Sequence, residues 1–182
     1  MWPPTHPPRA EPASQYRARG AWRDRPVGRH LTRAAALWPD ALTVVDGDRR
    51  LTFAQDDRQA TTLPAAALHA RGTGQDDVVS FQLPDRAEAV VSFHAITKVG
   101  AVANPIVPNY RGHELRFILG QAQSKIVFVP SRCQGYDYPG LYRSPHGDLP
   151  ELRDMVVVGG GTGDGTEKSI TRGKVDAMFR TM

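Results

Sequence analysis

The sequence predicts an α/β protein in which helices cover both faces of a parallel β-sheet. Four short runs of mostly apolar residues, at 78–83, 102–106, 125–129 and 155–158, have the length and composition of buried strands. Stretches with helical periodicity separate the first three runs. Strands that alternate with helices favour parallel pairing. We therefore expect a partial three-layer, Rossmann-like sheet with right-handed crossovers.

The segment before the sheet divides into a leader and the start of the folded domain. Residues 1–27 are expected to form a flexible leader rich in proline and arginine, and five prolines in its first twelve residues argue against a helix there. A helical stripe then runs from Leu31 to Trp38 and is ended by Pro39. Residues 28–160 are expected to form the domain, and residues 161–182 a tail that is disordered or does not belong to the domain.

A β-hairpin and a long helix are expected next. The hairpin is predicted over residues 43–53, with Asp46-Gly47 at its turn. The helix should run from Thr52 to about Ala70, although Pro64 lies well inside it. An interior proline removes a helical hydrogen bond and clashes with the preceding turn, at a cost of about 3 kcal/mol.

Two further helices are predicted between the strands. Asp85 and Glu88 resemble a capping box at the start of a helix over 87–99, and Gly100 supplies its stop. The spacing of Leu115, Ile118, Leu119 and Ala122 marks the second amphipathic helix.

Composition and charge exclude several classes of function. Residues 1–33 hold seven arginines and only two acids, so the net charge of +4 lies near the N-terminus. The rest of the predicted domain is therefore near neutral, and no nucleic-acid partner is expected. No apolar run is long enough to span a membrane, and no signal-peptide pattern opens the chain. The single cysteine, Cys133, excludes an internal disulfide, and a cytoplasmic location is expected.

A set of motifs in a fixed order resembles the first part of a known superfamily. The motifs are Tyr16–Asp24, Leu51–Phe53, Val78–Asp85, Lys98–Arg111, His113–Leu119, Gly135–Tyr138 and Leu149–Leu152. The chain is similar to the AMP-binding, adenylate-forming acyl-CoA synthetases and ligases. Within them, it most resembles the branch with cyclohexanecarboxylate–CoA ligase-like and dihydroxybenzoate-adenylating enzymes. The resemblance implies the first part of the large N-terminal domain of such an enzyme.

The resemblance also implies a reaction and its cofactors. In this superfamily a carboxylate attacks the α-phosphate of ATP, in the presence of Mg²⁺, to give an acyl-adenylate that is passed to a thiol, usually that of coenzyme A. The superfamily's Ser/Thr/Gly-rich phosphate loop, aromatic-Thr-Glu element, ribose-binding Asp and catalytic Lys have no counterpart in these 182 residues. We therefore expect no catalytic, cofactor-binding or metal-binding residue here, and no cofactor for this chain alone.

The glycine-rich tail is not a phosphate loop by its pattern. In a Walker loop the lysine directly follows a glycine, whereas Thr166 and Glu167 separate Gly165 from Lys168. No apolar helical pattern follows that would place a helix N-terminus at the phosphates.

Five residues or pairs invite a functional interpretation, and each has a simpler structural one. His94 lies mid-helix and is expected to be a core or half-buried histidine. His113 with Glu114 should form a solvated first helical turn, Asp137 should hold a loop, and Lys98 should sit favourably in a last helical turn. Cys133 has no nearby histidine to activate it.

Departures from the superfamily's pattern leave three hypotheses open. Pro64, Asp56 and Asp76 stand where the pattern has a helix former, an apolar residue and a turn glycine, and each should weaken the scaffold. The chain is expected to be a truncated ligase that is inactive alone. The alternatives are half of a split ligase completed by a complementary fragment, and a non-catalytic interaction module.

Overall fold

A computed structural model describes residues 10–23, 25–143 and 149–158. Within this part of the chain, a four-stranded sheet runs in the order β4 (Val102–Pro105), β3 (Val78–Phe81), β5 (Ile126–Pro130), β8 (Asp154–Val158). All three strand pairs are parallel. The predicted fold class and its four strands are therefore confirmed, with β3 ending two residues earlier than the pattern suggested.

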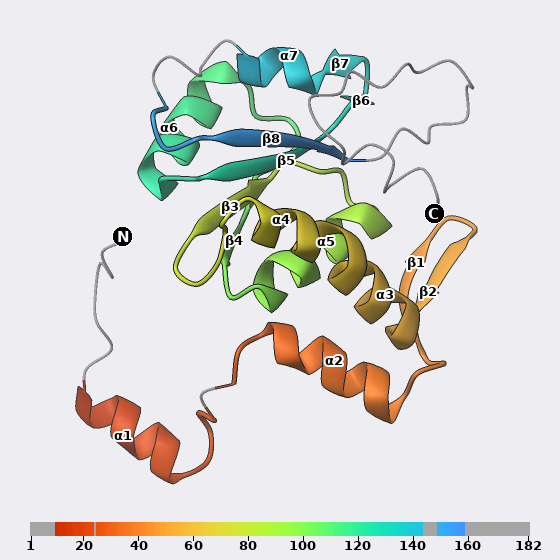
Figure 1. Cartoon of the computed structure of the whole chain (residues 1–182), viewed down its shortest axis with the longest axis vertical. Coiled ribbons are helices and arrows are strands. Elements are labelled where there is room, and N and C mark those ends of the chain that lie inside the picture. Colours follow the sequence, from red (N-terminus) through yellow and green to blue (C-terminus); the bar gives the residue numbers. More distant parts are fainter. Residues whose placement is uncertain (1–9, 24, 144–148, 159–182) are drawn as a thin grey trace.

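Helices cover both faces of the sheet, as Figure 1 shows. Residues alternate along β5, so that Ile126 and Phe128 face one side while Val127 and Val129 face the other. The first side packs against α4 (Ala66–Ala70) and α5 (Ala87–Lys98) through Leu68 and Ile96. The second side packs against α6 (Gly112–Ala122) and α7 (Tyr138–Arg143).

A further layer lies outside α5. It consists of α2 (Gly28–Leu37), the hairpin β1 (Leu42–Asp46) and β2 (Arg49–Thr52), and α3 (Phe53–Ala60). Leu31, Leu51 and Val91 share its small apolar cluster. The predicted hairpin is confirmed, and its turn residue Gly47 has a φ of +58°.

The leader contains a helix that the sequence argument excluded. Helix α1 spans Ala10–Ala18, so the prediction that prolines prevent any helix there was wrong. Pro12 lies in the first turn, where a backbone N–H has no partner within the helix and its loss is tolerated. The ring of Tyr16 in this helix stacks on that of Trp22, which follows the helix, with centroids 5.4 Å apart. The flexibility of residues 1–27 stays a prediction.

The helix predicted from Thr52 to Ala70 is divided into three segments. Helix α3 is followed by a π-helical segment, η1 (Thr61–Ala65), and then by α4. Segments of this kind mark irregularities in helices, and η1 contains Pro64, the residue that the sequence marked as unfavourable there. The hydroxyls of Thr61 and Thr62 donate to the carbonyls of Asp57 and Arg58, 2.7 Å away in both cases.

The start of α5 is capped by a different part of the chain than predicted. Its N-cap residue is Arg86, whose side chain makes no capping bond, so the Asp85–Glu88 capping box was wrong. Instead, the N–H of Ala87 donates to Oδ2 of Asp46 in the hairpin, at 3.0 Å. Glu88 pairs with Arg49 of the same hairpin. The predicted stop at Gly100 lies directly after the C-cap residue of α5, with a φ of +84°.

No helix in the described ranges is both long and apolar enough to cross a membrane.

Candidate functional site at the carboxyl edge of the sheet

The carboxyl ends of parallel strands form the edge where α/β proteins usually bind ligands. Here Phe81 is level with Pro105, and Pro130 is level with Val158. The loop 106–111 follows β4. The small hairpin of β6 (Arg132–Cys133) and β7 (Tyr136–Asp137), which the sequence analysis did not foresee, follows β5. The segments that leave this edge are therefore the first place to look for a site (Figure 1).

Gln82 fixes the loop after β4 to the sheet. Its side chain is fully buried, and its Nε2 donates to the carbonyls of Val107 (2.9 Å) and Tyr110 (3.1 Å). Its Oε1 accepts a hydrogen bond from the hydroxyl of Tyr142 in α7, at 2.9 Å. Burial raises the pKa of Tyr142, so this hydroxyl keeps its proton and remains a donor. The nitrogen of one buried amide thus holds the loop, while α7 holds the oxygen of the same amide.

Two more side chains hold the same loop from its outer side. The hydroxyl of Tyr138 donates to the carbonyl of Pro108 at 2.8 Å, and burial raises the pKa of Tyr138 as well. Nη1 of Arg111 donates to the carbonyls of Pro108 and Tyr110, both at 2.8 Å. The guanidinium of Arg111 also lies 3.8 Å from the centroid of the Tyr136 ring, a cation–π contact. The loop after β4 and the β6–β7 hairpin therefore form one connected platform.

A second polar cluster lies inside the sheet. The hydroxyls of Ser80 and Ser124 are 2.6 Å apart, and Nδ2 of Asn104 donates to Ser80 at 2.9 Å. Ser80 and Ser124 are both buried, so the cluster ties β3 to β4 and to the start of β5 without facing solvent.

The residues singled out by their chemistry are scattered over the fold. The N–H of Arg111 donates to Glu114 at 3.1 Å, and hydrogen bonds from backbone N–H groups hold the pKa of Glu114 below its usual value. Asp137 accepts a hydrogen bond from the N–H of Gly140 at 3.2 Å, and Cys133 is half-buried. These contacts stabilise a helix start and a loop.

His94 and Lys98 lie elsewhere, between α5 and α3. Nδ1 of His94 is 2.9 Å from Oδ2 of the fully buried Asp56. Nζ of Lys98 donates to Oδ1 of Asp57 at 2.6 Å and to the hydroxyl of Thr61 at 2.7 Å. Lys98 is therefore more than a favourable charge in a last turn, since it joins two helices.

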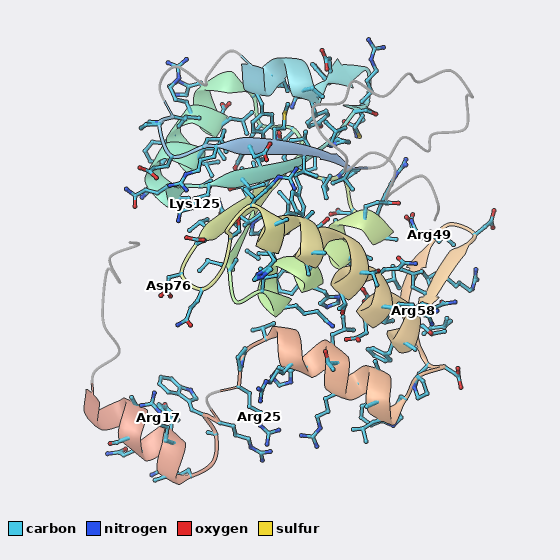
Figure 2. The ribbon with its side chains drawn as sticks, viewed as in Figure 1. Arg17, Arg25, Arg49, Arg58, Asp76 and Lys125 are labelled. Carbon is cyan, nitrogen blue, oxygen red and sulfur yellow. The ribbon has the colours of Figure 1, made fainter. Side chains whose placement is uncertain are left out.

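The sequence analysis also missed two ion pairs at the opposite, amino edge of the sheet. Lys125 pairs with Asp77, and Arg71 pairs with Asp154. Burial alone would raise the pKa of Asp77, but hydrogen bonds from Lys125 and from the N–H of Gly74 outweigh burial and hold it below the usual value. A pocket of about 180 Å³ lies beside these pairs. Figure 2 shows Lys125 and Asp76 at this edge, and Asp76 has the left-handed φ (+67°) of the turn glycine it was predicted to replace.

The described residues contain no group of three or more His, Cys, Asp or Glu placed to hold a metal ion. Of the two arginines of the carboxyl-edge platform, Arg111 already bonds two carbonyls, and Arg132 lies exposed in β6. Without a metal-ligand group among the described residues, we derive no reaction step through ATP and Mg²⁺. That the chain holds no catalytic residue stays a prediction.

The fold and this edge define an α/β protein with a parallel sheet that helices cover on both faces. Comparison with known sequences is more specific, because residues 31–175 match the family of AMP-binding enzymes. The chain belongs to that family, which confirms the resemblance seen in its motifs. The match extends beyond Gly160, and the assignment of residues 161–182 to a separate tail stays a prediction, on residues outside the described ranges.

Individual relatives show which enzymes of the family this chain resembles. The chain is 35% identical over 153 residues to a salicylyl-CoA synthase / salicylate adenylyltransferase of a Streptomyces species, covering 84% of this chain and 28% of that protein. It is 29% identical over 149 residues to the 2,3-dihydroxybenzoate-AMP ligase of Bacillus subtilis, covering 82% and 28%. The apo structure of MbtA from Mycobacterium smegmatis superposes with a TM-score of 0.74 at 33% identity, covering 84% and 28%. The chain thus spans a little over a quarter of the length of these relatives.

Proposed function

We propose that this chain forms the first part of the large domain of a ligase that activates a carboxylic acid as its acyl-adenylate. The observation that supports the proposal is the family match, which includes all four sheet strands and so covers the scaffold around which such a domain is built. Two of the relatives described above are named for hydroxybenzoates, so aryl acids are the first substrates to test.

We also propose that the 182-residue chain catalyses no adenylation by itself. Phosphoryl and nucleotidyl transfer depend on groups that position the phosphates and offset their charge as pyrophosphate leaves. In the superfamily these groups belong to the phosphate loop and the catalytic lysine, for which the sequence has no counterpart. The described residues would supply the scaffold, with ATP, Mg²⁺ and coenzyme A held mainly by other parts of a complete enzyme.

Pyrophosphate–ATP exchange tests whether the chain is inactive by itself. The purified chain is incubated with ATP, Mg²⁺, labelled pyrophosphate and, in turn, salicylate, 2,3-dihydroxybenzoate and a medium-chain fatty acid. The full-length Streptomyces relative is the positive control. We expect exchange no higher than in the blank without enzyme. Acid-dependent exchange by the chain alone would overturn the proposal that it is inactive.

A further inference from the structure

We infer that Val107, Tyr110 and Tyr136, with the stacked Arg111, form a docking surface for the remaining part of an adenylate-forming ligase. We call this surface the carboxyl-edge patch. The inference rests on the proposed function, and it adds the surface and the partner.

The patch is apolar, exposed and continuous. Val107 is 50% exposed, Tyr136 49% and Tyr110 37%. Tyr110 and Val107 share a tight turn, since the N–H of Tyr110 donates to the carbonyl of Val107 at 3.1 Å. Arg111 follows Tyr110 directly and lies on the ring of Tyr136. Isolated exposed apolar residues are ordinary, whereas neighbouring ones from two separate segments mark an interaction surface.

The patch is held in shape by the buried side chains of Gln82 and Tyr138 and by the half-buried Arg111. Gln82, Tyr138 and Arg111 together bond three carbonyls of the loop that carries Val107 and Tyr110. Tyr142 in turn fixes the amide of Gln82. A loop with its carbonyls held in this way loses little conformational freedom when a partner covers it. Such rigidity favours docking over the alternative of a mobile surface loop.

The direction of the chain identifies the partner. Because the strands are parallel, β8 ends at the same edge of the sheet as the patch, with Val158 level with Pro130. The chain covers 28% of each relative, so almost three quarters of each relative lies outside the shared region. The polypeptide that continues from β8 in these relatives therefore leaves the sheet at the carboxyl edge. A partner equivalent to that polypeptide would therefore lie at the same edge of the sheet as the patch.

A chimera tests the inference. The present chain replaces the matching first part of the Streptomyces salicylyl-CoA synthase, and salicylate-dependent pyrophosphate exchange and the melting temperature are measured. The test variant is Val107→Glu/Tyr110→Glu, which puts charges into the patch but leaves the backbone carbonyls for Gln82. The matched control is Val45→Glu/Phe117→Glu, at side chains that are 60% and 66% exposed on the β1–β2 hairpin and on α6.

We expect the unsubstituted chimera and the control to be active, and the test variant to lose about tenfold or more of the exchange rate and to melt earlier. An active chimera that tolerates the test variant as well as the control would overturn the docking surface. A folded chimera without activity would overturn the proposed function, while its melting temperature would still report on docking. A chimera that does not fold would overturn both, because the chain would not complete the domain.

The full chain alone provides a second measurement, by size-exclusion chromatography with light scattering. We expect it to self-associate without a fixed stoichiometry and to bind an apolar dye, and the test variant to reduce both effects more than the control does. A stable dimer that the test variant dissolves would show that a second copy of this chain covers the patch, and would overturn the ligase partner.

Discussion

Single substitutions at Asp56 and His94 test how each member of a buried pair contributes to stability. Asp56 is fully buried on α3, and neither carboxylate oxygen has a hydrogen-bond partner among the described residues. His94 on α5 approaches within 2.9 Å, but its ring nitrogen is not oriented as a hydrogen-bond donor to the carboxylate. His94 retains 20% side-chain exposure. The buried Asp56 therefore depends on His94, whereas His94 has access to water.

The change in the free energy of unfolding depends on which of the two side chains remains. His94→Ala leaves an uncompensated buried carboxylate, and such losses cost about 3–5 kcal/mol. Asp56→Ala removes a buried carboxylate that has no hydrogen-bond partner among the described residues and leaves an imidazole with access to water, so we expect a gain of about 1 kcal/mol. At about 4 °C per kcal/mol, the melting temperature should rise by about 4 °C for Asp56→Ala and fall by about 12–20 °C for His94→Ala.

Thermal and urea unfolding of the two single variants and of the double variant measure these effects. The double variant should recover most of the stability that His94→Ala loses, because the carboxylate is gone. The reasoning is refuted if Asp56→Ala destabilises the chain as strongly as His94→Ala. That result would mean that the pair is a net stabilising contact and not a tolerated burial.

Two further substitutions probe the amino edge of the sheet and the docking of α2. The folded pKa of Asp77 lies below its ordinary 3.8, so the ion pair with Lys125 stabilises the chain above about pH 4 and is lost as the pH falls through the lower folded value. In acid titrations of stability, Asp77→Asn should therefore lower stability at neutral pH and flatten the acid limb, and an unchanged acid limb would contradict this. A Cβ at Gly28 would lie 2.7 Å from the carbonyl oxygen of Thr97, so Gly28→Ala should lower the free energy of unfolding by about 1–3 kcal/mol in urea. The control Gly112→Ala, which has open space around the new Cβ, should cost nothing. Equal effects of the two substitutions would refute the close packing of α2.

The sheet was predictable because its signals are local. Each strand is a short apolar run, and the stop of α5 at Gly100 depends on one residue with a positive φ. Pro64 was marked as unfavourable inside the predicted helix, but the division of that helix by the π-helical segment η1 was not predicted, because it depends on the surrounding chain as well as on the local sequence. Asp56 was correctly seen as a poor fit to a core position.

The contacts that could not be predicted join residues far apart in the sequence. Asp46 caps α5 at Ala87, and Gln82 meets Tyr142, 60 residues away. Nothing in the local pattern around Asp85 showed that a hairpin carboxylate would take the capping role. The platform at the carboxyl edge was missed for the same reason, since Tyr138 and Arg111 look like ordinary loop and helix-start residues until the fold brings them together.

The capping of α5 by Asp46 has a consequence for the order in which the chain folds during synthesis. The hairpin leaves the ribosome before α5 is made, so the acceptor for Ala87 is in place when that helix emerges. The apolar cluster beneath α5, from Leu31 to Ala95, uses only residues made before β4. The cluster under α6 and α7 starts at Ile106 and needs everything that follows. We therefore expect a nascent chain arrested with about 100 residues outside the ribosome to protect α2, α3 and α5 from protease while β3 remains unpaired, so that the carboxyl edge is the last part of the molecule to take shape.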